Sequence, residues 1–278
     1  MSSRAMTTRR ASIGSHAVLA VGALVMVVPF IWQIITSLKT IGESTQVPPG
    51  LWPAHPQWSN FDQVFTDLPF GSMFLNTALV AVGRTVAQLL FCSLAGYAFA
   101  RLRFPGRNII FAVFLALLMV PSYLLIIPQY QVIQSIGWLN TVQGIMLPGM
   151  FSAFGTFLLR QFFAGLPPSL DEAARIDGAN PLRIWWSVML PLVRPGLAAL
   201  AVLTFLWSWN DLLWPLVVIT SPDKMTLSPG LASLQSQFTT NYPVLMAGAL
   251  VATVPVIAVF IVLQRQFIEG VAAAGNKG

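Results

Sequence analysis

The stretch that most constrains the fold reads Pro167-Pro-Ser-Leu-Asp-Glu-Ala-Ala-Arg-Ile-Asp-Gly-Ala-Asn-Pro-Leu-Arg-Ile-Trp-Trp-Ser-Val-Met-Leu-Pro191. It is rich in charged and polar residues, yet long apolar segments lie on both sides of it. Its first half predicts a short helix, because Ser169 and Glu172 have the spacing of a capping box. Gly178 fits the left-handed residue that commonly ends a helix.

The second half of this stretch predicts another short helix. Asn180 suits its N-cap and Pro181 its first helical position. Ile184, Trp185 and Val188 would form its apolar face. Local physics therefore predicts a capped helical hairpin, which needs no partner to explain it. A short exposed helix also fits the groove of a soluble partner, so both interpretations stay open at this point.

Apolar stretches on either side of the hairpin are long enough to cross a bilayer. Charged residues make up only 9% of the chain and hydrophobic residues 56%. A soluble chain carries about 25% charged residues, so this one requires a bilayer as its solvent. We expect an all-α integral membrane protein with six transmembrane helices, over residues 16–38, 72–100, 108–128, 141–163, 193–219 and 242–263. The prolines inside or near these spans should kink the helices; they are Pro29, Pro121, Pro148, Pro215 and Pro255.

Positive charge alternates from one connection to the next. The connections predicted to lie outside hold only Lys39 and Lys224. The positive-inside rule then places both termini in the cytoplasm, together with the hairpin. The N-terminal apolar run exceeds a signal-peptide core, so we expect a retained helix. The residues that set this orientation are Arg4, Arg9, Arg10, Arg101, Arg103, Arg107, Arg175, Arg183, Arg265 and Lys277.

Several stretches resemble one family of membrane proteins. Glu172-Ala-Ala174, Gly178 and Val188-Met-Leu-Pro191 resemble the EAA motif of binding-protein-dependent ABC importer permeases, although that family usually has isoleucine at position 188. Further similarity is to the carbohydrate branch, and in particular to the second permease subunit of maltose-type importers. It lies in Ala95–Gly106, Phe157–Phe163, Trp207–Asp211 and Leu231–Gln235.

The resemblance implies a type I ABC importer permease fold in a bacterial plasma or inner membrane. It implies that loop 167–191 couples the chain to a separate ATPase subunit through Asp171, Glu172, Ala173, Ala174, Arg175, Asp177 and Gly178. The implied assembly has a second permease subunit as heterodimer partner, two copies of an ABC ATPase subunit and an extracytoplasmic solute-binding protein. It would carry a sugar or sugar-like solute, surrounded by membrane lipid, with no role for nucleic acid.

The expected organisation follows from the spans and the resemblance together. A cytoplasmic tail covers 1–15, the first transmembrane helix 16–38 and an extracytoplasmic segment 39–71, with a short interfacial helix starting at Ser59. The permease domain covers 72–265, and a second cytoplasmic tail covers 266–278.

Two polar groups inside predicted spans are candidates for a solute pathway. Arg84 and Gln88 are four residues apart, on one face of a helix, and a charge at this depth should face a partner or a wet cavity. They form either a polar pathway or a structural pair. Trp209, Asn210 and Asp211 lie toward the outer end of the fifth span, where they indicate either a sugar contact or an interfacial aromatic belt.

Other function classes lack their signatures. The chain has no G-x-x-x-x-G-K-[ST] loop, so we expect ATP hydrolysis on a separate ATPase subunit. An intramembrane enzyme would need a nucleophile, a base or a metal cluster in the bundle, and the sequence shows none, so we expect no enzyme activity and no cofactor. His16 and His55 are too far apart in the predicted topology to form a pair of metal ligands. The single cysteine, Cys92, lies in an apolar run that predicts a buried position, so we expect no metal site. The alternative is a secondary transporter driven by an ion gradient, but such proteins typically show internal repeats and midplane carboxylates.

Overall fold

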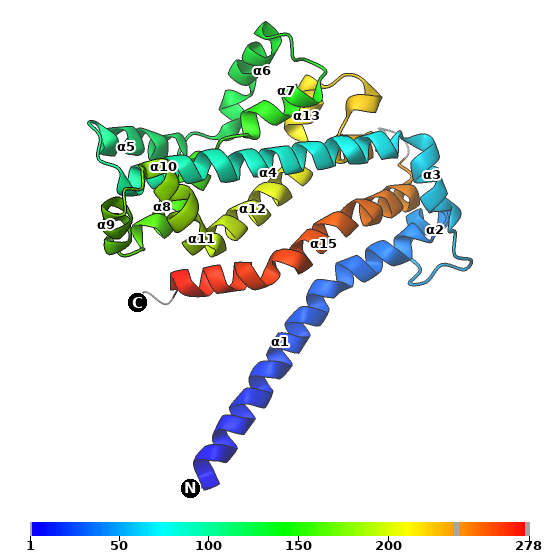
Figure 1. Ribbon diagram of the computed structural model, residues 1–278. Helices are drawn as coiled ribbons and strands as arrows, with labels where there is room; N and C mark the ends of the chain where they lie inside the picture. Colours follow the sequence, from blue (N-terminus) through cyan, green and yellow to red (C-terminus); the bar gives the residue numbers. More distant parts are fainter. Residues whose placement is uncertain (1, 236–239, 276–278) are drawn as a thin grey trace. The chain divides into compact units, whose positions relative to one another are not determined.

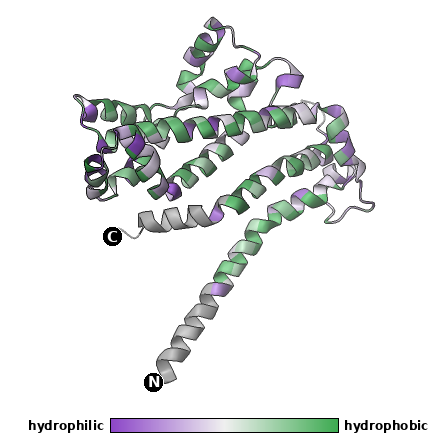
Figure 2. Ribbon diagram, in the orientation of Figure 1, coloured by the Kyte–Doolittle hydropathy of each residue, from purple (hydrophilic) through white to green (hydrophobic). Residues whose placement is uncertain are grey.

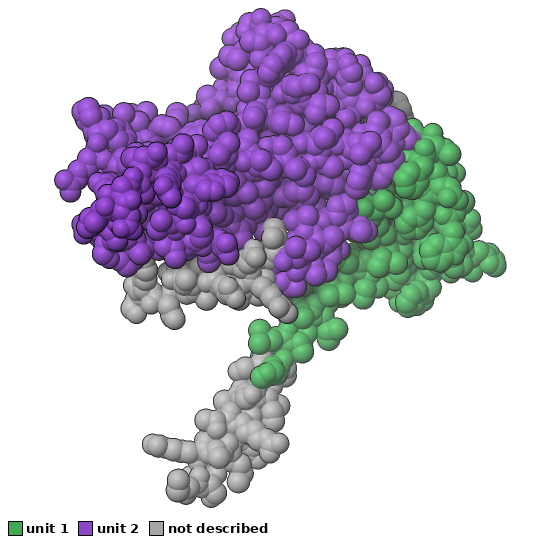
Figure 3. Space-filling model, in the orientation of Figure 1, with its two compact units in different colours: residues 1–67, 234–251 green, residues 68–233, 252–278 purple. Residues whose placement is uncertain are grey.

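The computed structural model describes the backbone of residues 2–235 and 240–275, and the side chains of residues 16–235, 240–262 and 264. These residues form helices joined by turns, and no strand occurs among them. The chain divides into two compact units, 1–67 with 234–251 and 68–233 with 252–278 (Figure 3). The predicted tail charges Arg4, Arg9, Arg10, Arg265 and Lys277 lie outside the described side chains.

The first unit contains α1 (Ser2–Ser37), α2 (Ile41–Thr45), α3 (Ser59–Asp67) and the start of α15 (Tyr242–Gly275). Lys39 is buried here: its Nζ donates to the carbonyl of Gly50 at 2.6 Å and lies 4.8 Å from the ring centre of Trp32. Asn60 donates to the carbonyls of Ser37 and Lys39, which fixes the start of α3. The helix start predicted at Ser59 is confirmed.

The second unit is built around α4 (Phe70–Arg101), which packs along α8 (Ala153–Ala164) and α12 (Arg194–Trp209) (Figure 1). Hydrophobic residues run along these helices, whereas hydrophilic residues gather near α9 (Figure 2). The remaining elements are α5 (Arg107–Leu117), η1 (Ser122–Leu125), α6 (Ile126–Ser135), α7 (Val142–Met146), η2 (Leu147–Gly149), α9 (Ser169–Ile176), α10 (Pro181–Ile184), η3 (Trp185–Met189), α11 (Leu190–Leu192), α13 (Leu213–Val218), η4 (Pro222–Lys224) and α14 (Leu227–Ala232).

Three of the six predicted spans are continuous helices. By length and hydropathy, Val18–Ser37, Phe70–Arg101 and Tyr242–Val262 can each cross a membrane. Pro29 and Pro255 lie inside α1 and α15 without ending them. The two terminal helices also extend beyond the predicted spans, from Ser2 in α1 and to Gly275 in α15.

The other three spans are interrupted rather than continuous, in line with the kinks expected from their prolines. α5 and the segment 122–135 meet at 99°, and the segments 142–149 and 153–164 meet at 44°. The fifth span leaves the helix after Trp209 and resumes as α13 at Leu213. Pro121 and Pro148 lie at or beside the first two breaks. Pro215 has no N–H to donate to the carbonyl of residue 211, and its ring opposes a continuous helix there.

Two apolar clusters in the second unit fix the helices on either side of α4. One joins α4, α8 and the hairpin through Cys92, Tyr97, Leu159, Phe163, Ile184, Trp185, Met189, Val193 and Leu200. The other joins α4 to α6, α7 and α13 through Val80, Ile133, Ile145, Trp214, Val218 and Ile219. Cys92 is fully buried, as its apolar context predicts.

Gly96 allows α4 and α8 to approach closely. A Cβ at this position would lie 2.9 Å from the backbone nitrogen of Arg160 and 3.2 Å from the carbonyl oxygen of Thr156. Backbone atoms of a packed helix cannot move aside as a flexible side chain can. The distance between the two helices therefore depends on the missing side chain.

We expect Gly96→Ala to lower the free energy of unfolding by about 1–3 kcal/mol, the usual effect of overpacking, and Gly96→Leu to lower it further. Gly71→Ala is the matched control, since a Cβ there meets nothing within 4 Å. Thermal unfolding of the purified protein measures both. Equal stability of Gly96→Ala and Gly71→Ala would contradict the close approach.

Candidate functional site

The first helix of the hairpin lacks the side-chain cap that the sequence predicts. α9 starts at Ser169, and its N-cap is Pro168, which has helical dihedral angles and makes no side-chain cap. The expected capping box of Ser169 and Glu172 is therefore wrong. A serine caps through its side chain only from an extended position before the helix, and here Ser169 is already inside it. The Glu172 side chain is exposed and makes no hydrogen bond or ion pair within the described structure.

The turn between the two helices follows its prediction. Gly178 has φ of +75°, the left-handed conformation that ends α9. The side chain of Asn180 accepts a hydrogen bond from the Arg183 N–H at 2.8 Å, and Pro181 is the first residue of α10. The second helix continues through the π-helical turn η3 into α11. Ile184 and Trp185 are buried, as expected of its apolar face.

Arg101, the last residue of α4, fastens the hairpin to the bundle. Its guanidinium forms an ion pair with Asp171 at 3.1 Å, and both side chains are more than 90% buried. The same group donates to the carbonyl of Phe163 from Nε at 3.0 Å and from Nη2 at 2.6 Å, and also to the carbonyl of Leu166. One side chain thus joins α4, the end of α8 and α9.

The carboxylate of Asp171 depends on this single arginine. Its Oδ1 is buried without a hydrogen-bond partner. Burial raises the pKa of Asp171, while nearby Arg101 and Arg175 act in the opposite direction. The hydroxyl of Tyr97 and the Nε1 of Trp185 are also buried without partners on this side of the hairpin. The charge of Asp171 is therefore paired, but its hydrogen bonding is incomplete.

The outer face of the hairpin exposes large apolar side chains. Ile176 is 86% exposed, Leu182 62% and Trp186 67%. We call these three residues the hairpin patch. Among the predicted coupling residues, Asp171 turns inward and Ala174 is half-buried, whereas Glu172, Ala173, Arg175, Asp177 and Gly178 are exposed. Exposed apolar groups on an otherwise polar turn make this surface a candidate for binding.

A second polar centre lies farther along α4. Arg84 forms an ion pair with Asp211 at 2.8 Å and donates to the carbonyl of Ile145 at 2.6 Å and that of Met146 at 3.4 Å. The pair spans α4, the end of α7 and the break that follows α12. All three nitrogens of the guanidinium are engaged in these contacts.

Gln88 belongs to the same centre. It donates to the carbonyl of Gly149 at 2.8 Å and accepts a hydrogen bond from Thr204 at 2.9 Å. Two cavities flank the Arg84–Asp211 pair. One, of about 240 Å³, includes Tyr123, Gln129 and Trp214 in its lining. The other, of about 260 Å³, is lined by Arg84, Gln88, Gly149, Thr204, Trp207, Ser208 and Asp211.

The other predicted pathway residues have different surroundings. Trp209 is buried, stacks on Phe205, and donates from its ring nitrogen to the carbonyl of Ala252 at 3.0 Å. It is a packing residue in this structure. Asn210 is exposed and donates to the carbonyl of Leu206 within its own helix end. Of the predicted triplet, only Asp211 lines the two cavities.

No separate signal in the sequence marks Arg101 as an anchor. It is one of three arginines between the second and third spans, and the positive-inside rule accounts for all three. Its pairing with Asp171 joins residues far apart in sequence. Among the described residues, no group of three or more histidine, cysteine, aspartate or glutamate side chains could hold a metal ion.

The family model and the similar proteins are all components of transport systems. Residues 92–272 match the family model described as "Binding-protein-dependent transport system inner membrane component". The diacetylchitobiose uptake system permease protein NgcG of Streptomyces coelicolor is 38% identical over 94% of this chain and 88% of its own length. The arabinooligosaccharides transport system permease protein AraQ of Halalkalibacterium halodurans is 41% identical, and the match covers 79% of each chain.

Two further proteins are similar along nearly their whole length. The sn-glycerol-3-phosphate transport system permease protein UgpE of Yersinia enterocolitica is 35% identical over 94% of this chain and 96% of its own. A crystal structure of a bacterial ABC transporter that imports the acidic polysaccharide alginate contains a chain with TM-score 0.79 and 27% identity. That match covers 94% of this chain and 98% of the other.

The Arg101 anchor can be tested by removing one charge and then both. Arg101→Gln leaves the Asp171 carboxylate buried without a counter-ion, which should lower the free energy of unfolding by about 3–5 kcal/mol. Arg101→Gln with Asp171→Asn buries no net charge and should recover part of that loss. Thermal unfolding and proteolysis within 167–191 report the effect. A double variant no more stable than Arg101→Gln would refute the pairing.

The same variant should respond to pH. Because the folded-state pKa of Asp171 is raised, the stability due to this group is present at low pH and is lost as pH rises through that pKa. Loss of Arg101 raises the pKa further. We therefore expect the deficit of Arg101→Gln to shrink on acidification from neutral pH. This pH dependence should be absent when Asp171→Asn is also present, although part of the deficit remains.

The Arg84–Asp211 pair calls for a test that separates structure from transport. Asp211→Asn should destabilise the protein by about 2 kcal/mol, since Arg84 loses its counter-ion at membrane depth. Arg84→Gln with Asp211→Asn should restore stability. Transport by that stable double variant indicates a structural pair, whereas its loss indicates a pathway role. An unchanged melting temperature in Asp211→Asn would contradict the contact itself.

Proposed function

Because the chain belongs to the family of binding-protein-dependent transport system inner membrane components, we propose that it forms half of a solute pathway that a separate ATPase drives through α9. The chain itself is a multi-pass permease subunit of a bacterial ABC importer with the type I fold, located in the inner membrane, and is not the ATPase. The alternative of an ion-gradient transporter has no support among these relatives.

The hairpin patch is the observation that carries the coupling proposal. Ile176, Leu182 and Trp186 present apolar surface beside the exposed charges of Glu172 and Asp177. An ATPase subunit with a complementary groove would cover this surface. The Arg101–Asp171 anchor supports the same proposal, because an element that receives force needs a firm attachment to the bundle. This proposal places the hairpin and both termini in the cytoplasm, consistent with the arginine distribution.

The proposed assembly contains this chain, a second permease subunit, two copies of an ATPase subunit and an extracytoplasmic solute-binding protein. A separate ATPase is required because the sequence contains no phosphate-binding loop. ATP-driven closure of the ATPase pair would move α9 and, through Arg101, the end of α4. The solute pathway would then open alternately to the two sides of the membrane.

We infer that the solute is a carbohydrate or a similar polyhydroxylated molecule. Three of the similar proteins are described by names that contain a saccharide: diacetylchitobiose, arabinooligosaccharides and alginate. The 260 Å³ cavity fits such a solute in its chemistry. It combines the amide of Gln88, the hydroxyl of Ser208, the carboxylate of Asp211 and the ring of Trp207, which is 55% exposed. Polar hydrogen-bonding groups beside an aromatic face suit a sugar ring.

Coupling can be tested by altering the outer face of α9 while keeping its anchor. Glu172→Ala removes an exposed charge, and Ile176→Glu places a charge in the hairpin patch. We expect each to lower receptor-stimulated ATP hydrolysis by the purified importer about tenfold, the size of effect expected at an interface hot spot. Membrane insertion and the folding of the permease should not change. Full stimulation in both variants would refute the docking role.

Two controls make this test specific. Val47→Glu changes a residue that is 91% exposed in the segment predicted to lie outside, and should leave stimulation unaltered. Asparagine tolerates the positive φ of Gly178, whereas leucine does not. We therefore expect Asn to preserve coupling and Leu to impair it. Glu172→Gln isolates the charge of Glu172, since no capping hydrogen bond is at stake.

A further inference from the structure

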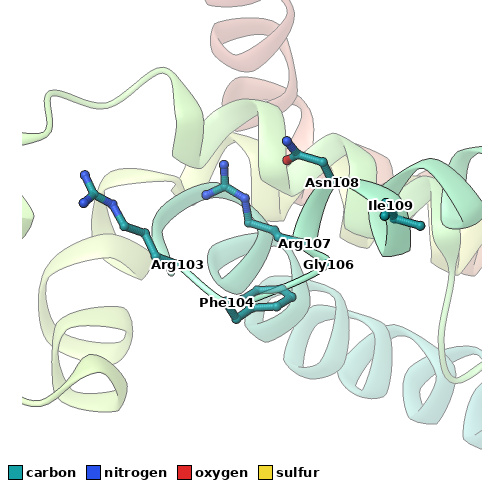
Figure 4. Close-up of a pocket in the computed structure, with 6 residues that line it drawn as sticks. All are labelled: Arg103, Phe104, Gly106, Arg107, Asn108 and Ile109. Carbon is teal, nitrogen blue, oxygen red and sulfur yellow. The ribbon is translucent and has the colours of Figure 1, made fainter.

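We propose that the turn between α4 and α5 binds the headgroup of an anionic phospholipid from the cytoplasmic leaflet. The turn surrounds a cavity of about 480 Å³ (Figure 4). Its lining comes from one short stretch of chain, Arg103, Phe104, Gly106, Arg107, Asn108 and Ile109. The guanidinium groups of Arg103 and Arg107 extend to the same side of the turn (Figure 4).

The charge in this cavity is uncompensated. Arg103 is exposed and makes no hydrogen bond or ion pair within the described part of the chain. Arg107 is half-buried and uses one nitrogen, Nη1, to donate to the carbonyl of Leu102 at 3.0 Å. No carboxylate lines the cavity. Arg103 and Arg107 also line a larger neighbouring cavity, of about 920 Å³, where Asp171 and Glu172 lie among the lining residues. An anion that binds these two arginines from the side of the smaller cavity meets no carboxylate.

An apolar surface for acyl chains continues from the same cavity. Ile109, Val113 and Leu117 follow one another at intervals of four residues on α5, so they lie on one face of the helix. Their exposed fractions are 73%, 55% and 52%. Phe111 and Phe114 lie elsewhere around the helix and contact Phe157 and Phe151. α5 therefore packs against the bundle on one side and offers a bare aliphatic stripe on the other. This stripe begins at Ile109, which also lines the cavity.

These features together match a phospholipid better than a soluble anion. A phosphate between two guanidinium groups can accept charge-assisted hydrogen bonds. The aliphatic stripe would contact the acyl chains, which a free phosphate lacks. Two unpaired arginines would repel the amine of a zwitterionic headgroup, so phosphatidylglycerol should bind more tightly than phosphatidylcholine. The inference relies on the proposed orientation, which places this turn at the cytoplasmic surface.

Native mass spectrometry of the purified importer, titrated with each lipid in detergent, tests this site. We expect Arg103→Gln and Arg107→Gln each to weaken phosphatidylglycerol binding roughly fivefold, as one arginine near an anionic headgroup implies. Asn108→Ala should weaken it without a change in charge. Arg183→Gln is the matched control: it removes an exposed arginine outside the cavity and should leave binding unchanged.

Four outcomes would overturn the proposal. Equal binding of phosphatidylcholine would remove the charge preference, and equal weakening in Arg183→Gln would show a diffuse attraction instead of a site. Displacement of the lipid by millimolar inorganic phosphate would indicate a soluble anion. Loss of the ATPase subunit from the Arg103→Gln complex would assign the turn to a protein interface. If lipid binding fails while Glu172→Ala still impairs coupling, the proposed transport function stands without this site.

Discussion

The guanidinium of Arg101 sets the position of the hairpin relative to the bundle. Arg101 donates to the carbonyl of Phe163, in the last turn of α8, and to that of Leu166, just beyond the helix, while it pairs with Asp171. One planar group thus satisfies a helix end and neutralises a buried carboxylate. The turn at Gly178, the cap at Asn180 and the exposed patch beyond them all depend on where this contact holds α9.

Among the described side chains of the second unit, two ion pairs occur, and both have their arginine on α4. Arg84 and Arg101 are separated by about 25 Å of helix, at 1.5 Å per residue. Arg101 reaches the hairpin, whereas Arg84 reaches the carbonyls at the end of α7 and the break after α12. The absence of a side chain at Gly96 brings α8 against α4 between the two. The hairpin and the polar centre are therefore fixed to the same continuous helix.

Local signals in the sequence predicted the features that depend on neighbouring residues. Gly178 and Asn180 have the conformation and hydrogen bond that their residue types favour. The capping box failed because Pro168 adopts a helical conformation, so that Ser169 lies one position too late. Pro215 predicted a kink in the fifth span, but the break after Trp209 lies earlier in the chain, and hydropathy averages over Asn210 and Asp211 there. The pairs of Arg101 with Asp171 and of Arg84 with Asp211 are tertiary contacts that no local pattern specifies.

The separation between Arg84 and Asp211 also bears on biogenesis. The two residues are 127 positions apart in the chain. At a translation rate of about 5–20 residues per second, Arg84 is made roughly 6–25 s before its counter-ion exists. During that time α4 carries an unpaired positive charge that hydrocarbon disfavours. Until the fifth span is made, the second span should therefore stay near the insertion machinery or be shielded by water and lipid headgroups. The order of synthesis thus delays the release of the second span into the bilayer.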